Sequence, residues 1–265
     1  MPTVSNRGAS IYYATDGDAE GPPVVFVADA GLGGWSWGWQ HAALAGPFET
    51  VVWDLRGTGR STTPAGPYDL ETLVSDLEAV CRAAGYRRVH LVGLGLGGAI
   101  ALEAAHRTGR VETLSLVGTA AHGDAFDLDS LLVPVDDDGD DETAAALADS
   151  LEHGLSEPFR TDHPDVVEGI VDWRLEGDAG RTGLQGQLEA LEAFDVRDRL
   201  FEITQPALVF HGTADELVSP AAGEALADGL PRGEFVPLEG AGHLATIERS
   251  RVVNDRLFEF LEFED

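Results

Sequence analysis

Short, continuous apolar runs recur along the chain, and each is bounded by turn-forming residues. Such runs are typical of strands that are buried on both faces, as in parallel sheets, whereas half-exposed strands alternate apolar and polar positions. The pattern therefore predicts strands at residues 11–15, 24–28, 50–53, 89–92, 113–117 and 207–210, with a weaker one at 234–236.

Stretches with a helical spacing of apolar residues separate these runs. One of them carries an apolar stripe along residues 73–84, which includes Cys81, and it stops at Gly85. Further helices are expected near residues 39–45, 98–107 and 252–262. Strands that alternate with helices predict an α/β fold, in which a mostly parallel sheet of roughly eight strands is covered by helices on both faces.

The segment from residue 122 to residue 197 breaks this alternation. It holds a dense acidic run at 136–142 and then helix-like pieces at 143–151, 164–175 and 184–194. We interpret it as a helical cap inserted between two parts of one core, residues 1–121 and 198–265. Ligands of open α/β sheets bind at the carboxyl ends of the strands, so a cap at that end would close over the binding site.

The charge balance of the chain is extreme. It has 47 acidic and 17 basic residues, a formal net charge of −30, and every basic residue is an arginine. This acidic, lysine-free composition, with acids spread along the chain, resembles that of proteins from halophilic, salt-accumulating archaea. An acidic protein with a partner that binds acids is the alternative. Nucleic acid and anionic membrane surfaces are poor partners for such a chain.

We expect the stability of the folded chain to depend steeply on salt. Like charges repel one another in dilute buffer, and the screening length falls from about 30 Å at 0.01 M to about 3 Å at 1 M salt. The melting temperature should therefore rise between dilute buffer and molar KCl. Equal melting temperatures at the two salt levels would remove the halophilic interpretation.

The sequence carries no targeting, disulfide or metal signal. It begins without a basic run followed by an apolar stretch, and no apolar run approaches the roughly 18 residues of a membrane helix. We therefore expect a soluble, cytoplasmic protein that binds a small molecule. The single cysteine, Cys81, excludes an internal disulfide, and the eight histidines lack metal-ligand spacing. No metal or cofactor is expected, and the oligomeric state stays open.

The sharpest motif lies between a predicted strand and a predicted helix, at Val92-Gly93-Leu94-Gly95-Leu96-Gly97-Gly98. It resembles the nucleophile elbow G-x-S-x-G of the α/β-hydrolase family, with Gly95 at the serine position. Three further segments match that family in the family's own order: residues 53–61, residues 210–215 ending in Asp215, and residues 240–243 ending in His243. The resemblance implies an α/β-hydrolase fold from about residue 24 to the C-terminus.

The resemblance assigns a role to each of these residues. A serine at position 95 would attack a carbonyl, while His243 took its proton and Asp215 held the imidazole. The backbone N–H groups of Leu96 and Ala30 would form the oxyanion hole. Gly95 removes the attacking atom, so ester hydrolysis through an acyl-serine is not expected. The pair of His243 and Asp215 is still able to remove a substrate proton or to activate water.

A second departure follows residues 24–27 of the first buried strand, where the family usually shows a His-Gly pair and this chain has Ala28-Asp29-Ala30-Gly31. A carboxylate of Asp29 that faced the site would oppose a developing oxyanion, whereas one that pointed away would cap a turn. Neither Thr119 nor Ser36 stands out as a substitute nucleophile. The absence of lysine excludes Schiff-base chemistry.

The pocket is expected to be lined by Asp29, Thr119 and the nearby tryptophans Trp35 and Trp37. Aromatic side chains such as those of Trp35, Trp37 and Trp39 line apolar pockets. The alternative is that at least one of these three packs against the sheet.

These features leave three hypotheses. The first is an enzyme in which His243, oriented by Asp215, acts as a general base on a small, mostly apolar ligand. The second is a non-catalytic ligand-binding or sensor protein on a hydrolase scaffold. The third is a serine esterase inactivated by substitution at Gly95, which the departure at Asp29 disfavours. The first predicts a hydrogen bond between Asp215 and His243, an imidazole that faces Gly95, and a raised imidazole pKa.

An elbow also predicts the backbone conformation of Gly95. The central residue of this turn has a positive φ, which strains any residue with a Cβ by about 1–3 kcal/mol. Gly95→Ser is therefore expected to lower stability by about 1–3 kcal/mol and to place a hydroxyl within reach of His243. A negative φ at Gly95 would mean that the segment is not an elbow.

Overall fold

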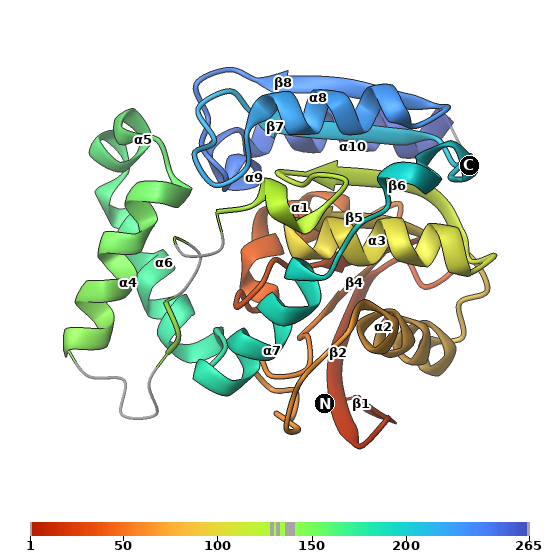
Figure 1. The fold of residues 1–265 in the computed structure, drawn as a ribbon, viewed down its shortest axis with the longest axis horizontal. Helices are drawn as coiled ribbons and strands as arrows, with labels where there is room; N and C mark the ends of the chain where they lie inside the picture. Colours follow the sequence, from red (N-terminus) through yellow and green to blue (C-terminus); the bar gives the residue numbers. More distant parts are fainter. Residues whose placement is uncertain (1, 128–129, 131–132, 136–140, 264–265) are drawn as a thin grey trace.

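The computed structural model describes residues 2–127, 130, 133–135 and 141–263. The strands are β1 (Thr3–Asn6), β2 (Ala9–Gly17), β3 (Pro23–Val27), β4 (Glu49–Trp53), β5 (Val89–Leu94), β6 (Val111–Val117), β7 (Ala207–Gly212) and β8 (Gly233–Leu238). Within the described residues they form one eight-stranded sheet in the order β1-β2-β4-β3-β5-β6-β7-β8 (Figure 1). β1 pairs antiparallel with β2, and β2 pairs antiparallel with β4, whereas the five pairs from β4–β3 to β7–β8 are parallel. The predicted, mostly parallel sheet is therefore confirmed.

Helices cover both faces of this sheet. In chain order they are α1 (Gly38–Leu44), α2 (Leu70–Ala84), α3 (Leu96–Arg107), α4 (Asp141–Gly154), α5 (Glu157–Asp162), α6 (Pro164–Gly177), α7 (Arg181–Glu192), α8 (Pro220–Gly229), α9 (Ala245–Glu248) and α10 (Ser250–Phe263). α2, α3 and α8 contribute to one buried apolar cluster, and α1, α9 and α10 contribute to a second. No helix in the described part of the chain is long and apolar enough to cross a membrane.

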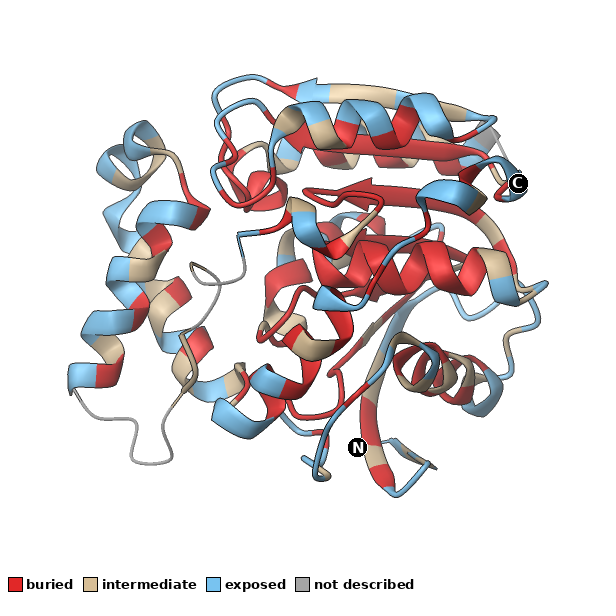
Figure 2. Ribbon diagram, viewed as in Figure 1, coloured by how far each residue is buried: buried red, intermediate tan, exposed pale blue. Residues whose placement is uncertain are grey.

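Strand β3 shows why the apolar runs are continuous. Val25 and Val27 join the first cluster, whereas Val24 and Phe26 join the second. Successive side chains of a strand point to opposite faces, so a strand between two helix layers must be apolar at every position. Figure 2 shows the result, with buried residues along the central strands and on the inward sides of the helices.

Local signals set the ends of α2. The Asp69 side chain accepts a hydrogen bond from the Thr72 N–H at 2.7 Å, and Gly85 follows the helix with a φ of 87°. Cys81 lies on the buried side of this helix, and burial raises the pKa of its thiol to about 12. A thiol with such a pKa stays protonated at neutral pH, so Cys81 is a packing residue and not a nucleophile.

Several elements escaped the sequence pattern. β1 is short, polar and partly exposed, so no apolar run marks it. α8 is built largely from alanine and glycine, which give a weak amphipathic pattern. α3 begins at Leu96 and not at residue 98, because the turn at Gly95 passes directly into the helix.

The segment between β6 and β7 has two different surroundings. Helices α4, α5 and α6 stand beside the sheet, on the left in Figure 1. From here on, the cap means these three helices and not the whole predicted segment 122–197. Arg174 of α6 donates to the Leu147 carbonyl of α4 at 3.2 Å and to Ser150 Oγ at 2.6 Å. α7 packs on the core instead, since a Cβ on Gly183 would lie only 2.0 Å from the Gly57 carbonyl oxygen.

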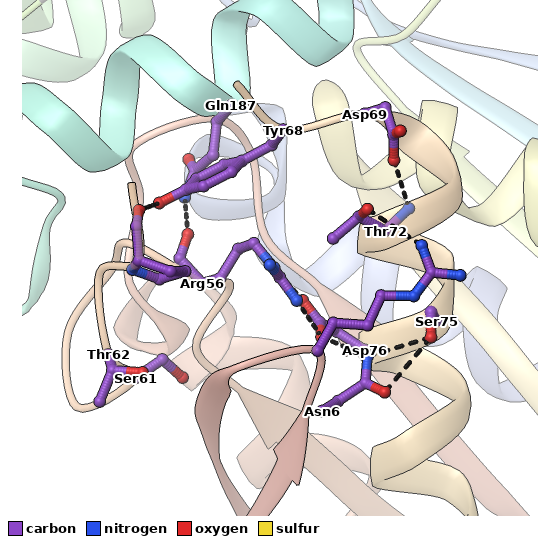
Figure 3. A network of polar contacts seen from close by, with 12 residues as sticks. Asn6, Arg56, Ser61, Thr62, Tyr68, Asp69, Thr72, Ser75, Asp76 and Gln187 are labelled. Atoms are coloured by element: carbon purple, nitrogen blue, oxygen red, sulfur yellow. Dashed lines mark hydrogen bonds and ion pairs between the residues drawn. The ribbon is translucent and has the colours of Figure 1, made fainter. Parts of the chain in front are cut away.

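A buried ion pair anchors the loop after β4. The Arg56 guanidinium donates to both carboxylate oxygens of Asp76 on α2, at 2.6 and 2.7 Å (Figure 3). The Gln187 side chain of α7 donates to the Arg56 carbonyl at 2.8 Å and accepts from the Gly31 N–H at 2.7 Å. These contacts join α2, α7 and the loop after β3, and that loop carries Asp29.

Candidate active site

β5 runs into a sharp turn at Gly95, and α3 begins at the next residue. Gly95 has a φ of 52° and a ψ of −115°, so the predicted positive φ is confirmed. The glycines beside it permit close backbone packing. A Cβ on Gly97 would lie 2.0 Å from the Val27 carbonyl oxygen, and a Cβ on Gly93 would lie 2.4 Å from the Gly97 carbonyl oxygen. The turn therefore brings the N-terminus of α3 against the end of β3.

The carboxylate of Asp29 points into the site. Its Oδ1 accepts hydrogen bonds from the N–H groups of Ala30 and Leu96, each at 2.7 Å. These are the two donors predicted to form the oxyanion hole, so an oxygen of the protein itself fills the hole. The interpretation in which Asp29 points away from the site is wrong, because the two N–H groups and the end of α3 attract the carboxylate inward.

His243 lies between two carboxylates. Its Nδ1 is 2.9 Å from Asp215 Oδ2, and its Nε2 is 3.0 Å from Asp29 Oδ2. The three side chains are almost completely buried, with residue exposures of 2% for His243, 6% for Asp215 and 1% for Asp29. The predicted contact between His243 and Asp215 is present. The other side of the ring, which was expected to face Gly95, contacts Asp29.

Further polar groups hold the Asp215 carboxylate in place. Its Oδ1 accepts from the N–H groups of Leu217 and Val218, at 2.9 and 3.0 Å. His211 Nε2 donates to the Val218 carbonyl at 2.8 Å and lies 3.2 Å from Asp215 Oδ2. These contacts fix the plane of the carboxylate and direct Oδ2 toward His243.

The two carboxylates hold a positive charge on His243. Burial alone would lower the pKa of the imidazole, but Asp215 and Asp29 together outweigh burial and raise that pKa to about 10. Burial also opposes the charged form of Asp215, yet His243 and His211 bring the pKa of this carboxyl below its usual range. At neutral pH the ring is therefore an imidazolium. An imidazolium donates protons, and it becomes a base only after it has lost one.

Gly95 and Asp29 form a matched pair in space. A Cβ on Gly95 would lie 2.0 Å from Asp29 Oδ1 and 2.5 Å from Asp29 Oδ2. A serine at position 95 therefore excludes the observed position of the Asp29 carboxylate. At 3.0 Å from His243 Nε2, Asp29 Oδ2 also makes the contact that a nucleophile makes with its histidine.

A small cavity of about 50 Å³ lies between the core and the cap. Asp29 and His243 line it from the core, and Ser150 and the buried Arg174 line it from the cap. A space of this size accommodates a few water molecules or a ligand of a few heavy atoms. Most of the remaining lining is apolar or small, and consists of Ala30, Gly31, Leu32, Trp35, Ser130, Val133, Leu151, Gly154, Leu217 and Leu244.

Two residues predicted for the pocket lie elsewhere. Trp37 packs against Phe26 with ring centroids 5.2 Å apart, so it belongs to the core beside the sheet. Thr119 lies under the elbow and donates to the Gly95 carbonyl at 2.9 Å. Trp35 does line the cavity, and its Nε1 donates to Asp178 at 2.7 Å.

Polar residues that no sequence motif marks join the cap to the core. Asp178 accepts from Arg174 at 2.7 Å and from the Gly33 N–H at 3.1 Å, which links α6 to the loop after β3. Glu248 accepts from the N–H groups of Gly242 and Ser156, at 2.8 and 2.9 Å, and so links the loop before His243 to α5. Only the i,i+4 spacing of Arg174 and Asp178 is a signal in the sequence.

Comparison with known proteins agrees with this geometry. Residues 24–256 match the α/β hydrolase family. The chain is 28% identical to 3-oxoadipate enol-lactonase 2 of Acinetobacter baylyi over 254 residues, which cover 95% of this chain and 93% of that protein. It is 29% identical to a non-heme chloroperoxidase of Streptomyces lividans over an alignment of 285 positions, which covers 99% of this chain and 100% of that protein.

A solved structure gives the same result. The enol-lactonase from Burkholderia xenovorans matches with a TM-score of 0.85 and 29% identity, covering 98% of this chain and 100% of that one. The sheet order, the elbow at Gly95 and the late positions of Asp215 and His243 agree with the family match. The chain therefore belongs to the α/β hydrolase family.

Proposed function

We propose that the chain is a hydrolase-type enzyme that works without a serine nucleophile. In this proposal His243, held by Asp215, transfers the proton in a reaction of a small, mostly apolar ligand bound under the cap. The observation that supports it most directly is the contact of 2.9 Å between the two side chains, of which His243 lines the cavity. A histidine that an aspartate orients is the usual proton-transfer group of such sites.

The cavity supports the class of ligand. Leu32, Leu151 and Leu244 form much of its wall, and Trp35 adds an aromatic surface. A wall of this kind favours apolar groups, while Asp29 and His243 on the core side and Ser150 and Arg174 on the cap side supply polar atoms. The small volume favours ligands of a few heavy atoms.

The resting state places one condition on the mechanism. His243 carries its proton between two carboxylates, so it is not a base until the charge beside it changes. Neutralising Asp29 would remove one of the two negative charges that hold the proton on the ring. The proposed reaction therefore begins with a change at Asp29.

Turnover of small substrates tests the role of His243. We expect the wild-type protein to hydrolyse at least one of methyl acetate, γ-butyrolactone and 1-bromopropane. His243→Gln should lower that rate by about 10²–10⁴-fold, because the proton-transfer group is lost. Asp215→Asn should lower it as well, because the imidazole loses the partner that orients it.

A surface histidine provides the matched control. His153 is half exposed and lies outside the site, so His153→Gln should retain the wild-type rate. Melting temperatures of all variants show whether a lost rate reflects lost folding. A His243→Gln variant that folds and keeps the full rate would contradict the proposed role.

The second candidate function is non-catalytic ligand binding. The filled oxyanion hole and the closed Asp29–His243–Asp215 cluster favour it, since both are stable without a substrate. A binder would show a ligand-dependent rise in melting temperature with one of the three molecules above but no product from any of them.

A further inference from the structure

The two carboxylate oxygens of Asp29 have different surroundings. Oδ1 is fixed by the N–H groups of Ala30 and Leu96, at 2.7 Å each. Oδ2 is 3.0 Å from His243 Nε2, and the side chain lines the cavity. One oxygen therefore occupies the oxyanion hole, while the other lies where a nucleophile would meet both the histidine and a ligand.

The filled hole decides which kind of carbon this carboxylate is able to attack. Attack on an ester carbonyl needs donors for the oxyanion that develops on the substrate, and Asp29 Oδ1 already occupies those donors. A tetrahedral carbon carries no carbonyl oxygen, so displacement there places the negative charge on the leaving group and does not need the hole. The geometry thus favours displacement over acyl transfer.

We propose that Asp29 is the catalytic nucleophile and that its substrates are short alkyl chains whose tetrahedral carbon carries a group that departs as an anion. This inference rests on the proposed function, in which His243 and Asp215 transfer the proton. It adds to that function the attacking atom and the substrate class.

In the first step, Asp29 Oδ2 forms a bond to the substrate carbon while the bond from that carbon to the leaving group breaks. The leaving group departs with the bonding electron pair, and Asp29 becomes a neutral alkyl ester. Arg174 lies in the cavity wall and is ion-paired through its Nε with Asp178, so its guanidinium offers N–H donors and not an unbalanced charge to the departing anion. The largely apolar lining suits the alkyl chain.

The loss of charge on Asp29 prepares the histidine for the second step. Only Asp215 then opposes deprotonation of His243, so the imidazolium releases its proton to solvent. The neutral ring, still held by Asp215, is now able to accept a proton from water. The same side chain therefore changes from an acid form to a base because its neighbour has been alkylated.

In the second step, water gives a proton to His243 and its oxygen bonds to Cγ of Asp29. The resulting negative charge forms on Oδ1, which already accepts hydrogen bonds from Ala30 and Leu96. Collapse breaks the bond from Cγ to Oδ2, and the alcohol leaves with Oδ2 and with the proton from His243. The new Asp29 acid returns its own proton to the ring. The net reaction consumes the alkyl substrate and water and yields the alcohol, a proton and the anion.

Turnover in water enriched in heavy oxygen tests this proposal on the wild-type protein. With 1-bromopropane as the probe, we expect bromide release and a heavy oxygen incorporated into the peptide that contains Asp29, because the attacking water leaves its oxygen on Cγ. Incubation without 1-bromopropane should leave the peptide unlabelled. This readout needs no variant, so a variant that fails to fold does not affect it.

Variants separate the two steps. In His243→Gln, bromide release should stop after a single equivalent, and the Asp29 peptide should carry a propyl group, since the ester forms but is not hydrolysed. Asp29→Asn should release bromide only at the uncatalysed rate. The control is Asp255→Asn, which removes an exposed carboxylate on α10 and should behave as wild type.

The outcomes distinguish this inference from the proposed function. Bromide release that depends on His243 but leaves Asp29 unlabelled would overturn the nucleophile and retain the role of His243. Labelling of Asp29 at equal rates in wild type and His243→Gln would support the nucleophile and overturn that role. A wild-type protein that releases no bromide and forms no adduct would overturn the nucleophile.

Discussion

Gly95→Ser alone should give a strongly destabilised protein without esterase activity. Asp29→Gly combined with Gly95→Ser should recover the part of the stability that the clash removes, and it should hydrolyse methyl acetate. The positive φ of Gly95 costs a residue with a Cβ about 1–3 kcal/mol. The added Cβ would also lie 2.0 Å from Asp29 Oδ1 and displace the carboxylate from its donors. The total loss should therefore reach about 3–5 kcal/mol, more than backbone strain alone predicts.

Removing the Asp29 side chain relieves this conflict. The N–H groups of Ala30 and Leu96 then point into an empty hole, and a serine hydroxyl at position 95 lies beside His243. One donor of an oxyanion hole contributes about 10²–10³ to the rate, so the double variant should exceed either single variant by at least about 10²-fold. Melting curves and acid release from methyl acetate measure the two effects.

The double-mutant cycle supplies the control. Asp29→Gly alone has an empty hole but no serine, so it should show no hydrolysis of methyl acetate above background. The sum of the stability losses of the two single variants should exceed the loss of the double variant, because a Cβ at position 95 and the Asp29 carboxylate occupy the same space. Additive losses and an inactive double variant would mean that Gly95 and Asp29 are not a matched pair. A serine esterase inactivated at Gly95 alone predicts instead that Gly95→Ser is sufficient for activity.

The stability of the wild-type protein should fall as the pH rises from about 6.5 toward 10. The pKa of His243 is raised from 6.5 to about 10 in the folded chain, so above pH 6.5 the folded state binds a proton that the unfolded state has lost. The contribution of the imidazolium is therefore fully present below pH 6.5 and is lost as the pH passes through the folded value. The slope should approach about 1.4 kcal/mol per pH unit.

Denaturant unfolding between pH 6.5 and 8.5 at fixed salt measures this slope. The upper limit keeps the measurement below the ordinary thiol pKa of 9.0, above which Cys81 contributes with the same sign. Asp29→Asn removes one carboxylate from His243, so its loss of stability should level off at a lower pH. His153→Gln, which changes an exposed histidine, should keep the wild-type slope. A pH-independent stability over this range would contradict a charged His243.

Local sequence determined the layered fold of this protein. Continuous apolar runs such as 24–28 and 89–92 predict strands buried on both faces, and the structure has β3 and β5 there. Gly85, where the apolar stripe stops, marks the C-terminal end of α2. The motifs around Gly95, Asp215 and His243, in this order, predicted the family. They also predicted the contact between Asp215 and His243, whose side chains lie 2.9 Å apart. The apolar runs and the helix end are local signals, and the motifs occur at the same places in the fold throughout the family.

Only the tertiary structure decided the chemistry of the site. Asp29 is 67 residues from Leu96 and 214 residues from His243, and the sequence leaves the direction of its side chain open. The space freed by the missing side chain of Gly95 and the two inward N–H groups draw the carboxylate into the oxyanion hole. Contacts between distant parts of a chain depend on packing that periodicity does not encode. The same reason applies to Arg174, whose place in the cavity wall follows from how the cap lies against the core.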